Sequence, residues 1–176
     1  MHDRMRTCIV IALAAFLSGG ARSQDGVLRF TRLVPLPAPK VAGHAEEYPG
    51  GMFNAENLVD GDARTEHSSN GKGTESFVEF DFGTLVPLAA LTHHDRAAPA
   101  TVAASERHLC GAEGAEVARW TIAHAAARSG LTTFILPARA PVRRARWRVT
   151  ALGPHGYGTV GGAEMRFFAA GAASGE

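Results

Sequence analysis

The chain has 176 residues, of which 45% are hydrophobic and 20% charged, and its formal net charge at pH 7 is +1. This length and composition are typical of one globular domain with a sizeable core. The near-neutral charge gives no support to binding of nucleic acid or of an anionic membrane surface. Beyond the N-terminus, no apolar run is long enough to predict a membrane span.

The N-terminus has the pattern of a targeting segment. Arg4 and Arg6 precede an apolar run, and the small residues Ala21 and Ser23 fit a signal peptidase site. We therefore predict a cleaved signal peptide over residues 1–23 and a mature protein that is secreted, periplasmic or held at the cell surface. A retained membrane anchor is the alternative, although the apolar run is short for a span.

Cleavage at this site would change the charge and the cysteine content of the chain. It removes three arginines and one aspartate, so the net charge would change from +1 to −1. Cys110 would then be the single cysteine, which excludes an intramolecular disulfide. Stability must then come from the core and from any bound ion.

The first part of the mature chain predicts one strand followed by loops. Residues 25–36 predict an opening strand that ends in coil, because Pro35 and the prolines after it cannot donate ladder hydrogen bonds. Residues 41–53 have the composition of a loop, and residues 68–75 form a polar turn cluster.

The clearest strand pattern follows at residues 77–82. Apolar side chains alternate there with Glu79 and Asp81, as in a sheet with one face in water. We predict that Gly83 ends this strand. Residues 88–92 are more continuously apolar and predict a central strand, and residues 93–104 predict a loop.

The C-terminal half contains one ambiguous segment among further strands. Residues 112–130 fit a short helix by their alanine content or a strand by Trp120 and Ile122. Residues 131–136, 145–150 and 163–168 predict strands, and we expect the tail at 169–176 to be disordered. Many short strands with turns between them predict an all-β, antiparallel sandwich.

A carboxylate pair around a glycine is the first candidate site. Asp60 and Asp62 flank Gly61, which permits a tight turn, and Thr65 follows three residues later. Hard cations such as calcium take six to eight oxygen ligands. Asp and Gly are also ordinary turn residues, so the triplet alone fits a cation site or a plain turn.

Several segments together give the chain a resemblance to a known family. They are residues 57–67, 76–83, 91–96, 146–150 and 161–168. In this order and spacing the chain resembles a discoidin or coagulation factor 5/8 type C domain, a galactose-binding-like β-sandwich that includes many bacterial carbohydrate-binding modules. The resemblance implies a jelly-roll sandwich over residues 24–168, and it favours a strand within residues 112–130.

The resemblance also implies a structural calcium ion between an early loop and the last strand. Its ligands, carried over by position, would be the Asn57 and Ala163 carbonyls, the Asp60 and Glu164 carboxylates, the Asp62 group and Thr65. This set of oxygens suits calcium rather than zinc. The family often has tryptophan where this chain has His67, which is a departure in the local packing.

An extracellular ligand bound by the end loops is the third implication. Arg96 matches an arginine of the sugar-binding relatives, and its fork of donors suits vicinal hydroxyls. A neutral histidine, His93 or His67, would add a donor or acceptor. Thr101 stands where the galactose-binding pattern often has asparagine, so galactose itself is not predicted.

Two structural alternatives accompany this ligand site. Arg96 could instead form a salt bridge with Asp95 or another acid. Tyr48 and Tyr157 are the loop aromatics that could stack on a sugar ring, whereas Trp120 and Trp147 fall in strand-like segments and are expected in the core.

No motif of an enzyme is present in the sequence. The neighbours His93 and His94 would point to opposite faces of a strand and could not easily share one metal ion. Zinc-site spacings, a nucleophile elbow and a phosphate loop are all missing. We therefore predict a secreted, calcium-stabilised, non-catalytic module that binds carbohydrate, with a protein-binding adhesion module as the alternative.

Overall fold

A computed structural model describes residues 32–155 and 158–171 of the chain. The predicted signal peptide at residues 1–23 lies outside the described residues, as do Tyr157 and residues 172–176. Most of the predicted opening strand lies outside them too.

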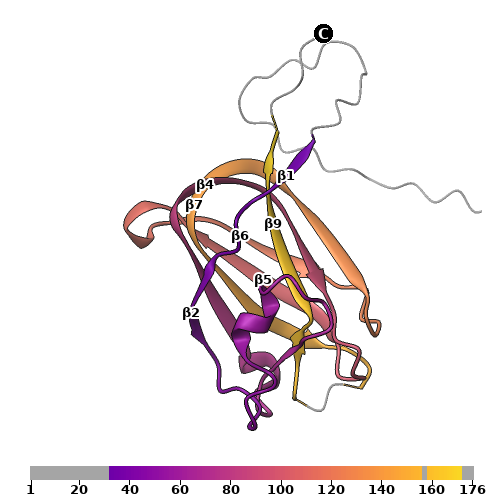
Figure 1. Ribbon diagram of the computed structural model, residues 1–176. Helices are drawn as coiled ribbons and strands as arrows, with labels where there is room; N and C mark the ends of the chain where they lie inside the picture. Colours follow the sequence, from indigo (N-terminus) through magenta and orange to yellow (C-terminus); the bar gives the residue numbers. More distant parts are fainter. Residues whose placement is uncertain (1–31, 156–157, 172–176) are drawn as a thin grey trace, which may run out of the picture. The chain divides into compact units, whose positions relative to one another are not determined.

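The described part of the chain is built from strands and single-turn 3₁₀ helices (Figure 1). The strands are β1 (Leu33–Pro35), β2 (Lys40–His44), β3 (His67–Ser68), β4 (Phe77–His94), β5 (Val102–Cys110), β6 (Glu116–Ala123), β7 (Leu131–Leu152), β8 (Gly161–Gly162) and β9 (Glu164–Ala170). The 3₁₀ helices are η1 (Ala55–Leu58), η2 (Gly73–Glu75) and η3 (Ala112–Gly114). Every strand pair is antiparallel, which confirms the predicted fold class.

The long strands β4 and β7 pair with each other and take part in both layers of the sandwich. Their first contact joins residues 77–81 to 144–148, in a layer that continues through β2 on one side and β5 and β6 on the other. Their second contact joins residues 90–94 to 131–135, beside β9 and β1. The short strands β3 and β8 form a separate pair.

Two predicted boundaries are wrong: the strand end at Gly83 and the break between residues 131–136 and 145–150. Both lie where β4 and β7 pass from one layer to the other. The register shifts between Asp81 and Val86, and Gly83 has a φ of 75°. Pro87 lies opposite Pro141 beyond this shift, so neither residue needs a ladder donor there. The irregularity therefore bends β4 rather than ending it. Residues 131–136 and 145–150 are likewise parts of the single strand β7.

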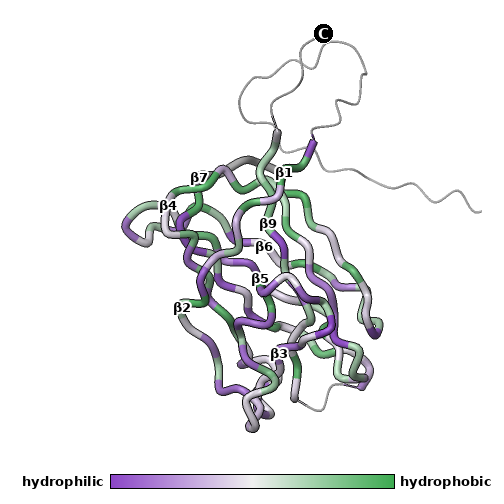
Figure 2. The backbone as a smooth tube through the Cα atoms, viewed as in Figure 1, coloured by the Kyte–Doolittle hydropathy of each residue, from purple (hydrophilic) through white to green (hydrophobic). Residues whose placement is uncertain are grey.

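Side chains from both layers fill the core. Phe80 of β4 packs edge-on against Phe167 of β9, with ring centroids 5.4 Å apart. Trp147 of β7 is fully buried, as predicted, and Trp120 packs against the core from its margin. Figure 2 shows how hydrophobic and hydrophilic positions interchange along the strands.

The remaining sequence predictions can be compared directly with the strands. Strand β6 confirms the strand interpretation of the ambiguous segment. Strand β9 pairs Ala169 and Ala170 with Val34 and Leu33, so the predicted disordered tail begins too early. No helix among the described residues is long and apolar enough to cross a membrane.

Candidate functional site

Arg96 follows β4 at one end of the sandwich and ties several loops together. Its side chain is nearly buried, and its Nε lies 3.0 Å from Glu66 Oε2 in an ion pair. Its Nη1 donates to Ser68 Oγ at 2.9 Å and to the Thr159 carbonyl at 2.6 Å. The other Glu66 oxygen accepts the Ala97 amide at 2.7 Å. The alternative of a salt bridge is therefore realised, with Glu66 rather than Asp95 as the partner.

Two aromatic rings lie beside this arginine. The Arg96 guanidinium carbon is 5.5 Å from the Phe53 ring centroid, and Tyr48 packs edge-on against Phe53 at 5.7 Å. The Tyr48 amide donates to the Ser68 carbonyl, which fixes this loop on β3. Tyr48 is 43% exposed, so its ring is accessible to solvent while Phe53 packs against it.

The two histidines that the sequence assigned to the ligand lie inside the protein. His67 and His93 are 0% and 1% exposed, respectively. Strand alternation turns His93 towards the core, and the His67 ring faces the Phe53 carbonyl, with Nδ1 3.2 Å from the oxygen. Burial lowers the pKa of His67 to about 4, so the ring is neutral. Direct contact between either ring and a surface ligand does not fit this burial.

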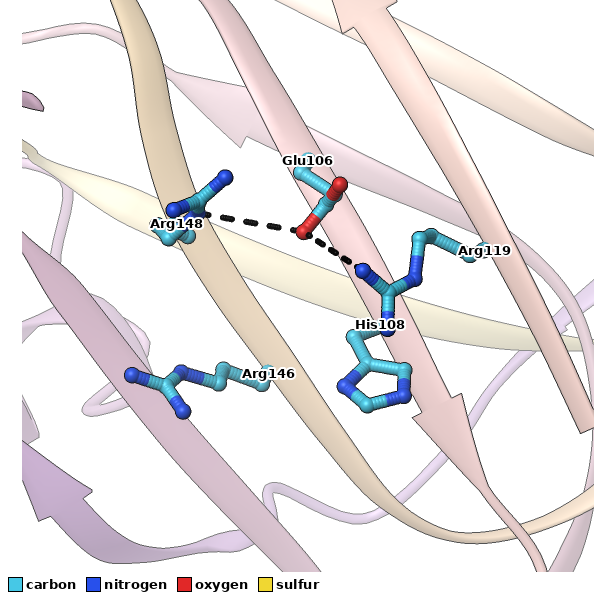
Figure 3. A pocket seen from close by; sticks show the side chains of 5 residues that line it. All are labelled: Glu106, His108, Arg119, Arg146 and Arg148. Atoms are coloured by element: carbon cyan, nitrogen blue, oxygen red, sulfur yellow. Dashed lines mark ion pairs between the residues drawn. The ribbon is translucent and has the colours of Figure 1, made fainter. Parts of the chain in front are cut away.

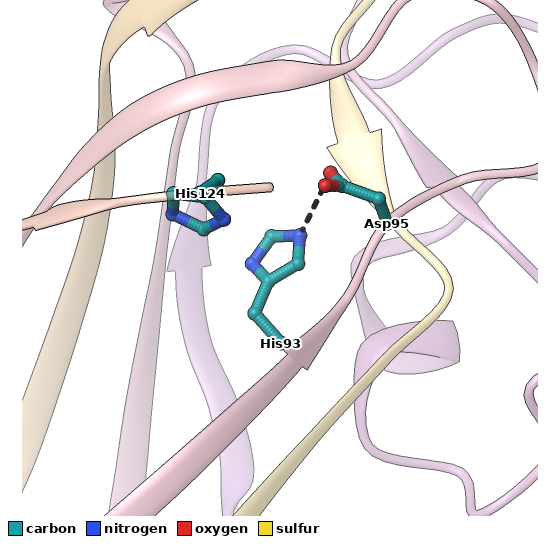
Figure 4. Close-up of side chains that lie close together, drawn as sticks. All are labelled: His93, Asp95 and His124. Atoms are coloured by element: carbon teal, nitrogen blue, oxygen red, sulfur yellow. Dashed lines mark ion pairs between the residues drawn. The ribbon is translucent and has the colours of Figure 1, made fainter. Parts of the chain in front are cut away.

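A cluster that the sequence analysis did not identify lies inside the sandwich and includes Asp95, the residue before Arg96. His93 and Asp95, two residues apart, point to the same side, and His124 faces them from the end of β6 (Figure 4). Among the described residues this is the one set of three His, Cys, Asp or Glu side chains whose ligand atoms all lie within 4.8 Å of one another. His94 points away and its Nε2 lies 3.0 Å from the Ser129 carbonyl, as expected for adjacent strand residues.

Burial controls the charge of this cluster. It lowers the pKa of His93 well below the ordinary value and that of His124 to about 3, so both rings are neutral. Burial also raises the pKa of Asp95 to about 6, although His124 and the Val102 amide act in the opposite direction. The neighbouring Arg107 is 1% exposed, and burial lowers its pKa to about 9.

The turn that the sequence assigned to calcium is closed by its own side chains. Asp60 Oδ1 accepts the Asp62 amide, and Asp60 Oδ2 accepts from Thr65 Oγ1, both at 2.8 Å. Gly61 has a φ of 86°, as the tight turn requires. The Asp62 carboxylate, however, turns to Arg64, with Oδ2 and Nη2 2.6 Å apart.

Glu164 opens β9 close to this turn. It is 5% exposed, and its Oε2 is buried with no hydrogen-bond partner among the described residues. Burial raises its pKa, and Asp60 and Asp62 act in the same direction, although Arg166 and the Gly61 amide act in the opposite one. A cation would supply the missing partner, so Asp60 and Glu164 fit the predicted calcium ligands by position.

The other two predicted calcium ligands are ordered by hydrogen bonds. The Asn57 side-chain amide donates to the Met52 and Glu66 carbonyls at 2.9 and 2.8 Å. The Ala163 amide donates to the His94 carbonyl at 2.8 Å. Both residues therefore hold the turn and β9 in defined positions.

A polar concavity of about 310 Å³ lies on the β5–β6–β7 face (Figure 3). It is lined by Glu106, His108, Arg119, Arg146 and Arg148. Glu106 Oε1 lies 3.7 Å from Arg119 Nη1 and 3.8 Å from Arg148 Nε. Arg146 Nη1 lies 3.4 Å from Glu79 Oε1. Among the described residues, its lining includes no Tyr, Trp or Phe ring on which a sugar could stack, so we do not assign the ligand to this concavity.

By sequence, the chain matches no protein-family model and no curated protein. By structure, it is similar to a family 32 carbohydrate-binding module from C. perfringens NanJ in complex with galactose, at 15% identity, with 79% of this chain and 99% of that chain covered and a TM-score of 0.62. It is also similar to chitosan-binding module 1 from a chitosanase/glucanase of Paenibacillus sp. IK-5, at 15% identity, 76% and 98% coverage and a TM-score of 0.61. A third similar structure is a Streptococcus pneumoniae fucose binding module, at 13% identity, 77% and 95% coverage and a TM-score of 0.57. The chain therefore has the galactose-binding-like β-sandwich fold of these modules, as its sequence resemblance implied.

Proposed function

We propose that the protein is a secreted, calcium-stabilised, non-catalytic module that binds extracellular carbohydrate through the loops around Arg96. Support comes from the fold, which is shared with solved modules whose names give chitosan, galactose or fucose as the ligand. The observation that carries the proposal within this chain is the exposed Tyr48 ring, which is fixed against Phe53 beside Arg96.

The surface around Tyr48 has the two properties that sugar recognition needs. A flat aromatic face can pack on the apolar face of a sugar ring, and neighbouring polar groups can bond its hydroxyls. Arg96 acts mainly by positioning, because its Nε and Nη1 are engaged with Glu66, Ser68 and the Thr159 carbonyl. A surface held in place before binding loses less entropy when the ligand arrives. Tyr157, outside the described residues, stays a predicted second contact.

Calcium would hold the turn at residues 60–65 against β9. The Asp60 and Glu164 carboxylates would be the charged ligands, with oxygens of Asn57, Asp62, Thr65 and Ala163 completing the set. The buried, unpartnered Glu164 Oε2 supports this assignment. Since Glu66 directly follows Thr65, an ion here would also steady the partner of Arg96.

A glycan array probed with the wild type and two variants tests the proposal. We expect the wild type to bind a defined glycan class in the presence of calcium. Tyr48→Ala should weaken binding by about tenfold or more, because it removes the stacking surface. Tyr48→Phe keeps the ring and should retain most of the affinity, and an unchanged melting temperature would show that each variant is folded.

Failure of the folded wild type to bind any glycan would contradict the proposal and favour the second candidate, a protein-binding adhesion module. The structure offers one observation for that alternative. Leu131 and Ile135, four residues apart on β7 and on the same face of the strand, are 62% and 67% exposed. Exposed apolar surface of this kind is typical of protein contacts.

A further inference from the structure

Four metal-binding atoms face one another inside the sandwich without hydrogen-bond partners. They are His93 Nε2, His124 Nδ1 and the two carboxylate oxygens of Asp95; none makes a hydrogen bond among the described residues, and His93 Nε2 and Asp95 Oδ1 form a loose ion pair at 3.5 Å. His93 and Asp95 are both 1% exposed. Leaving buried polar atoms without hydrogen bonds is costly, and one cation between the three side chains would bind both ring nitrogens and the carboxylate (Figure 4).

We propose that His93, Asp95 and His124 form a binding site for a divalent transition metal ion, with zinc as the best fit, distinct from the calcium position. Imidazole nitrogens with one carboxylate suit zinc and its neighbours in the transition series, whereas calcium prefers oxygen alone. Three protein ligands leave one tetrahedral position for water.

The distances in the cluster suit such an ion. Two ligands bound to zinc at about 2.0–2.1 Å in tetrahedral geometry lie about 3.4 Å apart. His93 Nε2 and Asp95 Oδ1 are 3.5 Å apart, and all the ligand atoms lie within 4.8 Å of one another. Small side-chain movements would therefore complete the coordination.

The surroundings of the cluster orient two of the ligands. His124 Nε2 lies 2.7 Å from Ser105 Oγ, which directs Nδ1 towards the cluster, as an outer hydrogen bond commonly does for a metal-binding histidine. The Asp95 amide donates to the Gly130 carbonyl at 2.8 Å, which joins the end of β4 to the loop after His124. A metal ion would add a second link between the same two segments.

Arg107 limits the affinity of the site. Its Nη2 lies 3.5 Å from His93 Nδ1, the ring nitrogen that is not paired with Asp95. An arginine can only donate, so in the metal-free protein the His93 proton belongs on Nε2, facing Asp95. Metal binding at Nε2 must move that proton to Nδ1, where it faces the guanidinium and its positive charge, so removal of the guanidinium should strengthen binding.

Cobalt titration of the untagged chain tests the proposal, after metal is removed with a chelator and excess calcium is added to fill oxygen sites. Visible absorption of protein-bound Co²⁺ should reach saturation at one ion per chain and disappear when Zn²⁺ is added. His124→Gln should weaken binding by at least about a hundredfold. His94→Gln, which changes a neighbouring ring outside the cluster, should bind as the wild type does, and Arg107→Met should bind about tenfold more tightly.

Folded wild type that gives no such absorption would overturn the proposal, as would His124→Gln that binds cobalt as tightly as the wild type. If His124→Gln does not fold, as judged by circular dichroism, the nearly isosteric Asp95→Asn replaces it with the same expected loss. Glycan binding is measured separately, so either proposal can fail without the other.

Discussion

Arg96 shows how a single side chain can join several loops at one end of the sandwich. The sequence identified its position after the strand, but the alternative partner Asp95 faces the opposite, buried side. Its partner Glu66 is 30 residues away in the chain, and no local pattern joins the two. The sequence could therefore predict the residue and not its partner.

The buried cluster had a local signal that we did not use. His93 lies near the end of β4 and Asp95 directly follows the strand, so alternation carried on past His94 puts their side chains on one face. The sequence prediction considered only the adjacent His93 and His94, which point to opposite faces, and not the pair His93 and Asp95. The third member, His124, could not be placed from sequence, because it approaches from a different strand.

Glu164 provides the residue-scale test of the calcium proposal. Chelator should lower the melting temperature of the wild type by about 5 to 10 °C when calcium had been present at about a hundred times its dissociation constant. Glu164→Gln should abolish this response. Without calcium this variant should be at least as stable as the wild type, because burial disfavours the ionised carboxylate.

Glu56→Gln is the matched control for that experiment, since it changes an exposed acid on η1. It should keep the full response to chelator. A wild-type melting temperature that does not depend on chelator would contradict the calcium assignment.

At the scale of elements, sequence patterns identified the strands but not their continuity. The alternation at residues 77–82 correctly predicted that Val78 and Phe80 are buried, whereas Phe82 is only partly buried. Gly83 and the prolines were interpreted as ends because they usually interrupt pairing. In the sandwich they occupy the bend at which β4 and β7 pass between layers, so the ladder continues on both sides.

Asp81 stabilises this bend and makes its stability dependent on pH. The Gly83 amide, followed by Arg143 and Arg144, lowers the pKa of Asp81 to about 2. Folding lowers the pKa of this acid from about 3.8, its value in the unfolded chain, to about 2. The ionised carboxylate therefore stabilises the fold fully at pH values above 3.8, and this contribution is lost as the pH falls through about 2. The wild type should therefore exceed Asp81→Asn in unfolding free energy by about 1 kcal/mol near neutral pH, after allowance for solvent screening.

Urea unfolding of both proteins between pH 2 and pH 7 measures that difference. It should shrink as the pH is lowered towards 2, where the wild-type carboxyl becomes protonated. A difference in unfolding free energy that stays constant from pH 2 to pH 7 would show that the ionised carboxylate does not stabilise the bend.

At the scale of the whole molecule, the sandwich brings the three candidate sites to neighbouring positions. The predicted calcium ligand Thr65 is followed by Glu66, which pairs with Arg96, and Arg96 follows Asp95 of the buried cluster. The sequence could predict the fold class, because alternation and turns are local patterns. Contacts such as Arg96 with Phe53 and the Thr159 carbonyl depend on loops that meet only after the sandwich closes.

The most direct test of the central claim is a two-dimensional NMR titration of the ¹⁵N-labelled protein with the glycan that binds best on the array. We predict that the amide resonances that shift belong to the loops at residues 45–53, 66–70 and 96–101. The resonances of residues 106–108 and 146–148, at the polar concavity of β5 and β7, should stay in place. Shifts confined to that concavity, or no shifts at saturating glycan, would contradict carbohydrate binding through the loops around Arg96.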